Sequence, residues 1–532
     1  MEGLPLLALL IAAVAVAALC RRFGLSGPLV LVVAGLAASF VPGVPDYTLS
    51  PELALLVFLP PLLYSAALES SYLGIRANLR PIGLLSVGAV LFTTVVVGFA
   101  VNALVPGLGL PLSFALGAIV APPDAVAATS IGRRLGLPRR VVTILAGESL
   151  VNDATALTAY RVAVGVTLGG GFSLLGGLGQ FVFAAVGGVT IGLLVAFLVT
   201  LINRLFRDAI VENTVGLLTP FVAYLAAEND VVHTSGVLSV VVAGLVIGHR
   251  SPRQSSYASR LQSLTLWRML DFLLESIVFA VIGLQLRSVV GALGQAGRGP
   301  ADLILTALLV SLVVIAARFV WVFPATYFPR LIGRLRERDP SPSWRIPFVI
   351  SWAGMRGVVS LAAAFGLPLR QSDGSALAGR DEVLFITFVV VIVTLVVQGF
   401  TLPTLIRRLG VQAAESAADN LAEAGAQQAA ADAAMSRLEA ILGEQDAEVP
   451  DGVVDRLRER VEIRALMAWE RLGDSGPDRR ETPQEAFRRL RRQLLQTERL
   501  VFVNLRDSGE IDDEVLRRVL MELDLEEALL AR

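Results

Sequence analysis

Residues 146–154 read Ala-Gly-Glu-Ser-Leu-Val-Asn-Asp-Ala, inside a segment that is otherwise apolar from Val141 to Ala159. An ionisable side chain at the centre of a bilayer costs at least about 3 kcal/mol, so such residues face the protein interior or water and usually lie on an ion pathway. On a helix, Ser149 and Asp153 share one face, and Glu148 and Asn152 share the neighbouring face. A carboxylate beside a hydroxyl is an oxygen-rich site that suits a proton or a small cation. The nonapeptide therefore predicts a membrane-spanning helix that carries an ion-binding site.

The composition of the chain points the same way. Of its 532 residues, 55% are hydrophobic and 17% charged, and the mean hydropathy is +0.68, which is far more apolar than a soluble protein. Apolar runs long enough to cross a hydrocarbon layer of about 30 Å recur through the first three quarters of the chain. These runs cover residues 3–20, 27–43, 51–67, 81–103, 112–130, 141–163, 181–202, 214–229, 234–249, 269–288, 302–327, 346–368 and 383–405. We therefore expect an all-α polytopic membrane protein with about 13 transmembrane helices.

The arginines between these runs indicate the orientation. Loops after odd-numbered runs hold 21 arginines, whereas loops after even-numbered runs, or the helix ends beside them, hold five. Basic residues concentrate on the cytoplasmic side of membrane proteins. We therefore expect a multi-pass protein of the plasma membrane with its N-terminus outside and its C-terminus in the cytoplasm. The first run has no basic residue before it and Arg21 and Arg22 after it, so we interpret it as an uncleaved helix.

The chain changes character near Arg408. Residues 1–409 carry a net charge of +9, whereas residues 410–532 carry −10. We interpret the first part as the transmembrane domain and the second as an acidic, helical, cytoplasmic region. Residues 411–436 suit an exposed helix or a linker, and residues 451–472 have the apolar spacing of a helix. Pro483 follows a helix-capping threonine, which predicts a helix start. A last helix is expected from about Asp512 to Leu530. This region is either a small helical bundle that aids dimerisation or a regulatory sensor.

Two of the apolar runs are interrupted near the middle. Ala121-Pro122-Pro123-Asp124 breaks the fifth run, because prolines remove backbone donors and clash with the preceding turn. Ser351 to Gly357 breaks the twelfth run with two glycines and an arginine. The two runs are seven crossings apart and therefore traverse the membrane in opposite directions. Paired broken helices of opposite sense are typical of inverted-repeat transporters, in which helix ends and free carbonyls bind ions near the midplane.

Asp153 is the residue we expect to bind the transported ion. One carboxylate that holds either a proton or a cation couples the two fluxes by competition. The alternative is that Asp153 forms a static ion pair. Ser149 either supplies a hydroxyl ligand or bonds to its own helix. Asn152 beside Asp153 is neutral, which favours one proton per monovalent cation.

The remaining polar residues near the breaks have alternative roles. Asp124 either binds the ion or neutralises the positive N-terminus of the second half-helix. Pro123 offers a freed carbonyl as a further ligand.

Several further charges lie in the predicted membrane segments. Glu148 and Arg356 are each costly alone, and we expect them to form a structural ion pair. Glu275 and Arg318 are additional intramembrane charges that are either structural or accessory to the site.

Several motifs together resemble one family. Gly147-Glu148-Ser149-Leu150-Val151-Asn152-Asp153-Ala154, Pro123-Asp124-Ala125-Val126-Ala127 and Gly354-Met355-Arg356-Gly357-Val358-Val359-Ser360 resemble signatures of the monovalent cation:proton antiporter-1 family, and Phe58-Leu59-Pro60-Pro61-Leu62-Leu63 and Gly283-Leu284-Gln285-Leu286 also fit. The resemblance covers residues 1–409 in order. This family includes bacterial NhaP-like and animal sodium/proton exchangers.

The resemblance implies a homodimer with thirteen helices, inverted six-helix repeats and electroneutral exchange of sodium, or lithium, for protons. By position, Asp153 matches the aspartate that binds cation and proton, Ser149 a ligand serine, and Glu148 with Arg356 the buried ion pair. Some members carry a glutamate shortly after the Leu-Pro-Pro element. This chain has Tyr64-Ser65-Ala66-Ala67 there, which leaves the number of cation ligands open.

The sequence thus predicts a sodium/proton antiporter that needs no cofactor and binds no nucleic acid. A potassium/proton antiporter is the main alternative, because cavity size and ligand number decide selectivity. A cation channel needs rings of carbonyls or charges around a continuous pore, whereas this chain has isolated charges on asymmetric broken helices. A membrane-bound enzyme or receptor is disfavoured, since the sequence has no nucleophile, metal or nucleotide motif.

Overall fold

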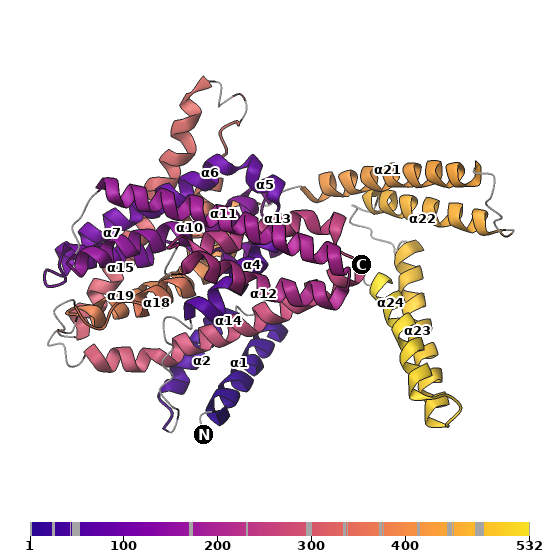
Figure 1. The fold of residues 1–532 in the computed structure, drawn as a ribbon, viewed down its shortest axis with the longest axis horizontal. Coiled ribbons are helices and arrows are strands. Elements are labelled where there is room, and N and C mark those ends of the chain that lie inside the picture. Colours follow the sequence, from indigo (N-terminus) through magenta and orange to yellow (C-terminus); the bar gives the residue numbers. More distant parts are fainter. Residues whose placement is uncertain are drawn as a thin grey trace. The chain divides into compact units, whose positions relative to one another are not determined.

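The structure is a computed structural model that describes residues 3–530 except 24–26, 43, 45–53, 170–173, 230–231, 294–299, 334–336, 338, 372–374, 376, 412–414, 444–449, 451 and 474–482. The described residues form helices and connecting turns without an extended sheet (Figure 1). Two compact units divide the chain, residues 1–412 and residues 413–532.

The first unit is a bundle of helices, several of them broken by π-helical turns or short gaps. Its first half contains α1 (Gly3–Phe23), α2 (Gly27–Ser39), η1 (Ala54–Phe58), α4 (Leu59–Glu69), α5 (Tyr72–Ala77), α6 (Leu79–Gly83), η2 (Leu84–Ala89), α7 (Val90–Leu104), α8 (Leu110–Val120), α9 (Ala125–Arg134) and α10 (Arg139–Thr167). Its second half contains α11 (Leu174–Phe206), α12 (Ala209–Glu228), α13 (Gly236–Gln254), α14 (Tyr257–Leu293), α15 (Pro300–Tyr327), η3 (Phe328–Leu331), α17 (Arg345–Trp352), α18 (Val358–Phe365), α19 (Arg380–Val393), η4 (Thr394–Gln398) and α20 (Gly399–Leu409).

Within the described residues, each apolar run predicted from the sequence falls on one, two or three consecutive helical elements. Both predicted breaks are confirmed, since α8 ends at Val120 before the two prolines and α17 ends at Trp352 before the glycines. Five continuous helices in the described part are long and apolar enough to cross a membrane, namely 79–104, 175–206, 209–228, 301–331 and 380–409. The count of thirteen crossings and the inverted repeats remain predictions.

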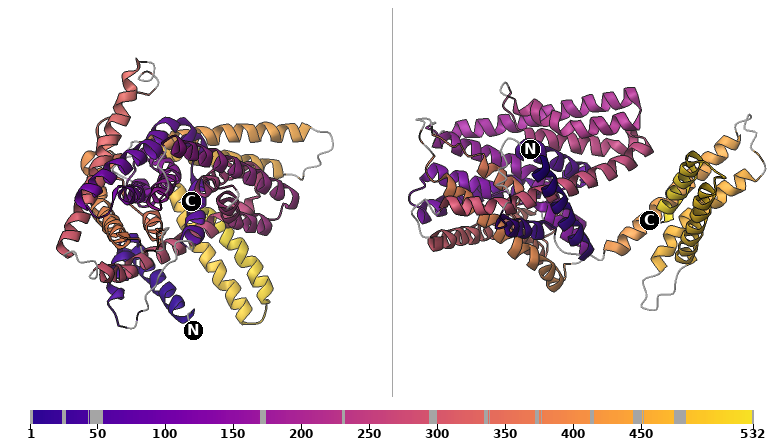
Figure 2. Two further views of the ribbon diagram at one scale, coloured as in Figure 1. Left: turned by 60° about the vertical axis from the view of Figure 1, so that its left-hand side comes forward. Right: turned by 90° about the horizontal axis from the view of Figure 1, so that it is seen from below.

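The helices of the first unit pack in two groups on either side of α10. In one group α4 and α11 pack on α13, α12 packs on α13, and α2 packs on α14. In the other group α7 packs on α8 and α15, and α15 packs on α19. Helix α10 contacts members of both groups, α8 and α13 among them. Figure 2 draws the ribbon from two further sides. The helix with the predicted ion-binding motif therefore lies where the two groups meet.

Small residues allow the closest of these contacts. At the crossing of α2 and α14, a Cβ on Gly283 would lie 2.9 Å from the Cα of Gly35, closer than Cβ atoms approach such atoms. Without side chains at these two positions the backbones can touch, which is the main source of attraction between helices in a bilayer.

The second unit consists of two antiparallel helix pairs. Helix α21 (Glu415–Gly443) packs on α22 (Val453–Gly473), and α23 (Pro483–Asp507) packs on α24 (Asp513–Leu530) (Figure 1). The predicted helix start at Pro483 and the last helix are confirmed, whereas the capping Thr482 lies outside the described residues. Arg491 and Glu526 join α23 to α24 through two hydrogen bonds of 2.7 and 2.8 Å.

Candidate functional site

The two helix breaks lie against each other. The backbone N–H of Asp124, between α8 and α9, donates a 2.7 Å hydrogen bond to the carbonyl of Met355, between α17 and α18. Two segments more than 200 residues apart therefore cross with their unwound parts in contact. Four helix ends converge at this crossing, together with the backbone groups that the ends leave unpaired.

Buried side chains satisfy several of these backbone groups. The Nε of Arg356 donates to the carbonyl of Val120, the last residue of α8, at 2.7 Å, and a further guanidinium nitrogen bonds to Gly354. Arg356 is 1% exposed. A cation at this place stabilises the negative C-terminal end of α8. The Nδ2 of Asn152 donates to the carbonyl of Pro123 at 2.6 Å, so that α10 is tied to the same break.

The prediction that Glu148 forms an ion pair with Arg356 is wrong, because Glu148 pairs with Arg318. Both carboxylate oxygens of Glu148 accept hydrogen bonds from Arg318 on α15, at 2.6 and 2.8 Å. Arg318 also donates to the carbonyl of Ile350 on α17. The physical reason is that Arg356 is itself part of the break and is used to bind the end of α8, whereas Arg318 presents its planar fork to the carboxylate.

Two glycines in the second break make room for these groups. A Cβ on Gly357 would lie 2.6 Å from the Cβ of Asp124, and a Cβ on Gly354 would lie 2.6 Å from the Nε of Arg318. Separations this short do not occur between such atoms. The glycines therefore allow the aspartate and the arginine to approach the unwound backbone.

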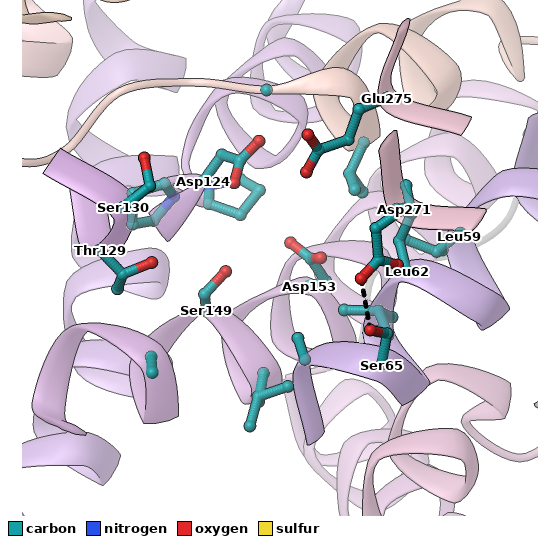
Figure 3. Close-up of a pocket in the computed structure, with 18 of the residues that line it drawn as sticks. Leu59, Leu62, Ser65, Asp124, Thr129, Ser130, Ser149, Asp153, Asp271 and Glu275 are labelled. Atoms are coloured by element: carbon teal, nitrogen blue, oxygen red, sulfur yellow. Dashed lines mark hydrogen bonds between the residues drawn. The ribbon is translucent and has the colours of Figure 1, made fainter. Parts of the chain in front are cut away.

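A cavity of about 260 Å³ lies beside the crossing (Figure 3). Its wall combines segments from α4, the first break, α9, α10, α14, the second break and α18. The charged residues on the wall are Glu69, Asp124, Arg133, Asp153, Asp271 and Glu275, and the hydroxyl-bearing residues are Ser65, Ser70, Thr129, Ser130, Ser149 and Ser360. Five acidic residues and one basic residue thus surround one cavity.

Asp153 occupies the inner part of this wall. Its side chain is 6% exposed and points into the cavity, and it has no hydrogen bond to any residue that the structure describes (Figure 3). The hydroxyl of Ser149 points into the same space from one helical turn away. The structure therefore brings together the carboxylate and hydroxyl that were predicted from their spacing on one helix face.

Asp124 lies across the cavity from Asp153. It directly precedes the first residue of α9, and its carboxylate points toward the space that Asp153 and Glu275 also face (Figure 3). It is close enough to Asp153 and Glu275 to interact electrostatically with both. Its position suits both predicted roles, because it adjoins a helix N-terminus and also lines the cavity.

Asn152 and Pro123 are placed differently from the other predicted ligands. Pro123 lines the cavity, but its carbonyl oxygen already accepts the bond from Asn152. Asn152 is completely buried and is absent from the cavity wall, and its Oδ1 has no hydrogen-bond partner among the described residues. The hydrogen bond between them ties α10 to the break, and their predicted role as ligands remains a prediction.

Some wall residues were missed by the sequence reasoning. Asp271 accepts a 2.5 Å hydrogen bond from the hydroxyl of Ser65 on α4, and Thr129 and Ser130 line the wall from α9. The signal for Asp271 was present, since it precedes Glu275 by four residues and so lies on the same face of α14. At one end of the wall, Glu69 forms an ion pair of 3.4 Å with Arg133, and both side chains are substantially exposed.

The carboxylates are spread along the wall instead of gathering at one point. Within the described ranges, no group of three histidine, cysteine, aspartate or glutamate side chains is close enough to hold a metal ion.

Paired broken helices around a buried carboxylate define a secondary-active ion transporter by fold and site. A family model described as "Sodium/hydrogen exchanger, transmembrane" matches residues 8–408. The chain belongs to this family of multi-pass membrane proteins, which are transporters of sodium and protons and not enzymes.

Individual relatives agree with this assignment. An uncharacterised sodium/proton exchanger of Mycobacterium tuberculosis is 35% identical over 99% of this chain and 96% of its own length. A sodium, potassium, lithium and rubidium/proton antiporter of Bacillus pumilus is 31% identical over 71% of this chain and 57% of its own length. Among solved structures, the sodium proton antiporter MjNhaP1 of Methanocaldococcus jannaschii at pH 8 superimposes with a TM-score of 0.60, at 20% identity, over 76% of this chain and 98% of that structure. This structural match concerns the fold and agrees with the family assignment.

Proposed function

We propose that this protein exchanges sodium, or lithium, for protons across the plasma membrane, with one cation exchanged for one proton. The observation that carries the proposal is the state of Asp153, a nearly fully buried carboxylate with no hydrogen bond to the described residues, which faces a polar cavity between two broken helices. A carboxylate kept at such cost in a membrane protein has a function that requires its charge.

The mechanism follows from competition for that carboxylate. A sodium ion bound to Asp153 and the Ser149 hydroxyl must leave before a proton can bind, and the reverse also holds. Glu148 does not take part, because Arg318 cancels its charge through two hydrogen bonds. Asn152 is neutral, so the centre itself offers a single carboxylate and favours electroneutral exchange.

Exchange also requires that the cavity faces the two sides in turn. The cavity wall includes the exposed pair Glu69–Arg133, at helix ends that the arginine distribution assigns to the cytoplasm. We infer that this conformation is open to the cytoplasm. Because α10 contacts both helix groups, movement of one group against the other would carry Asp153 toward the outside. A homodimer with an external N-terminus and a cytoplasmic C-terminus fits this proposal.

Potassium is the second candidate substrate. One relative is named as an antiporter of sodium, potassium, lithium and rubidium. In addition, the wall residues are spread around a cavity of about 260 Å³, and a loose arrangement of oxygen ligands discriminates weakly between cations of different size.

The test is proton flux in proteoliposomes that carry a pH gradient, with the membrane voltage clamped and sodium, lithium or potassium added in turn. The proposal expects sodium to collapse the gradient independently of voltage, and the Asp153→Asn variant to lose this activity while remaining folded. Collapse of the pH gradient by potassium alone would mean that the transported cation is potassium and not sodium. Collapse by sodium that depends on voltage would refute the one-to-one ratio, and full activity of Asp153→Asn would refute the central role of that residue.

A further inference from the structure

Asp271 is a carboxylate on the cavity wall for which neither the sequence motifs nor the central site account. It lies on α14, one helical turn from Glu275, and it is half-buried. Its Oδ2 accepts the 2.5 Å hydrogen bond from Ser65, whereas its Oδ1 is buried and has no hydrogen-bond partner among the described residues. A buried carboxylate oxygen without a donor is costly. The arrangement leaves one oxygen of Asp271 available to a ligand.

Ser65 holds this carboxylate in place. The serine is 3% exposed on α4 and comes from a segment 206 residues away in the sequence. Hydroxyl-to-carboxylate hydrogen bonds of this length are among the strong ones. The bond fixes the rotation of the carboxylate group and thereby the position of the second oxygen.

Asp271 also has a defined place between the exposed end of the wall and the centre. It interacts electrostatically with Glu69 on one side and with Glu275 on the other. Glu275 interacts with Asp124, and Asp124 with Asp153. The carboxylates therefore form a series along the wall, from an exposed residue to the buried one.

Acidic residues outnumber basic residues on this wall. The single basic residue on the wall, among those described, is Arg133, and it pairs with Glu69 at the exposed end. A cleft with low-dielectric walls and charges of one sign concentrates the opposite ion. The buried Asp153, which has no hydrogen bond to the described residues, faces the same space and gives the series an end point that binds a cation.

From these contacts we propose that Asp271, oriented by Ser65, is a second cation-binding carboxylate. Asp271 receives the sodium ion before the ion reaches Asp153, and it sets the apparent affinity for sodium on the side to which the cavity opens. The inference rests on the proposed function, since it concerns the path of the same ion. A series of separate carboxylates passes a cation onward, whereas a cage of three would retain it, and no such cage occurs in the described part of the chain.

The test compares Asp271→Asn with Asp271→Glu in proteoliposomes, by measuring the sodium dependence of proton flux at constant ionic strength. We expect Asp271→Asn to raise the KM for sodium about tenfold, which corresponds to about 1.4 kcal/mol, with kcat changed by less than about twofold. Asp271→Glu keeps the charge but displaces the carboxylate from Ser65, so it should raise the KM for sodium less than Asp271→Asn does. Asp302→Asn is the matched control, because Asp302 is an exposed carboxylate in the first turn of α15 and far from the wall residues in sequence.

Ser65→Ala provides an independent variant, because it retains the charge of Asp271 and removes its orienting bond. We expect a rise in KM of about threefold, and no additional rise when Ser65→Ala is combined with Asp271→Asn, since the serine acts through the aspartate. The sodium concentration that half-maximally raises the melting temperature reports binding without transport and should shift in parallel.

An unchanged KM and unchanged sodium binding in Asp271→Asn would overturn the inference, as would a loss of kcat with KM unchanged. Additive effects of the two substitutions would overturn the role of Ser65. If the wild-type protein shows no cation-dependent flux at all, the proposed function itself fails, and that outcome is distinct from the others. If Asp271→Asn does not fold, the Ser65→Ala result decides between the same alternatives.

Discussion

Glu148 on α10 and Arg318 on α15, 170 residues apart in the sequence, form a buried ion pair with two parallel hydrogen bonds of 2.6 and 2.8 Å. Arg318 additionally donates to the carbonyl of Ile350 at the end of α17. The pair thus joins three helices behind the cavity. Because the two charges cancel, the carboxylate of Glu148 does not compete for cations. Asp153, on the neighbouring face of α10, is left to bind them.

Breaking this pair should destabilise the protein strongly. Removing one member of a buried ion pair leaves an uncompensated charge and costs about 3–5 kcal/mol. We therefore expect Glu148→Gln and Arg318→Ala each to lower the melting temperature of the detergent-solubilised protein. The informative measurement is charge reversal. Glu148→Arg combined with Arg318→Glu should recover part of the lost stability and flux.

The matched control for that experiment is the other arginine. Glu148→Arg combined with Arg356→Glu should recover nothing, because Arg356 bonds to the backbone of Val120 and Gly354. Recovery with Arg356→Glu and none with Arg318→Glu would contradict the pairing seen here.

The second prediction concerns Gly357, in the second helix break. A Cβ at this position would lie 2.6 Å from the Cβ of Asp124, so Gly357→Ala should displace the aspartate or the break and reduce exchange by more than about tenfold. Gly165→Ala is the control, since Gly165 lies near the end of α10 with no atom within 4 Å of an added Cβ, and alanine favours a helix by about 1 kcal/mol over glycine. Equal activity of the two variants would show that the contact with Asp124 is unimportant.

The helices and their breaks could be predicted from the sequence because their causes are local. Apolar runs must form helices in a bilayer, where every backbone group needs a partner, and Pro122 and Pro123 interrupt a helix wherever they occur. For the same reason Ser149 and Asp153 could be placed on one face of α10 before the fold was known.

The partners across the helices could not be predicted in the same way. Arg318 and Arg356 are both buried arginines, and their positions in the sequence do not indicate which of them reaches Glu148. Ser65 and Asp271 are likewise 206 residues apart, and only the packing of α4 beside α14 brings them together. Hydropathy fixes which residues lie inside the membrane domain, whereas ridge-and-groove packing decides which of them meet.

Asp339, in the connection between η3 and α17, yields a prediction about pH. Its carboxylate lies 3.1 Å from Arg80, 2.8 Å from Arg140 and 2.7 Å from Arg330. Burial would raise the pKa of the Asp339 carboxyl, but hydrogen bonds from Arg140 and Arg330 outweigh this effect and hold the pKa below its usual value of 3.8. A pKa that is lowered by folding adds stability above the unfolded-state pKa, and this stability is lost as the pH falls through the folded-state pKa.

We therefore expect Asp339→Asn to lower the free energy of unfolding by about 1–3 kcal/mol at pH 7. The difference from wild type should begin to shrink as the pH falls below about 4 and should disappear once the pH is below the folded-state pKa. Thermal unfolding of both proteins across this pH range is the measurement. A difference that persists in acid would mean that Asp339 contributes by packing and not by its charge.

The division of the chain after Gln412 predicts that the first unit folds without the second. The described contacts of the cavity wall all come from residues 59–360. A protein truncated after residue 412 should therefore remain folded in detergent and keep sodium-dependent proton flux, with any regulatory contribution of residues 413–532 visible as a changed pH dependence. Complete loss of flux in a well-folded truncated protein would show that the second unit is required for exchange.

Competition at Asp153 predicts how sodium and protons should affect each other. If one carboxylate binds either ion, protons act as a competitive inhibitor, so the KM for sodium should rise about tenfold for each unit of pH below the point where Asp153 binds a proton, with kcat unchanged. Separate sites for the two ions would leave the KM independent of pH. The measurement is sodium-dependent proton flux at a series of pH values that are equal inside and outside the vesicles, with transport started by a sodium gradient. A KM that stays constant while kcat falls with acidification would assign the proton to a different group, and Glu275, which faces the same cavity, would then be the next residue to replace.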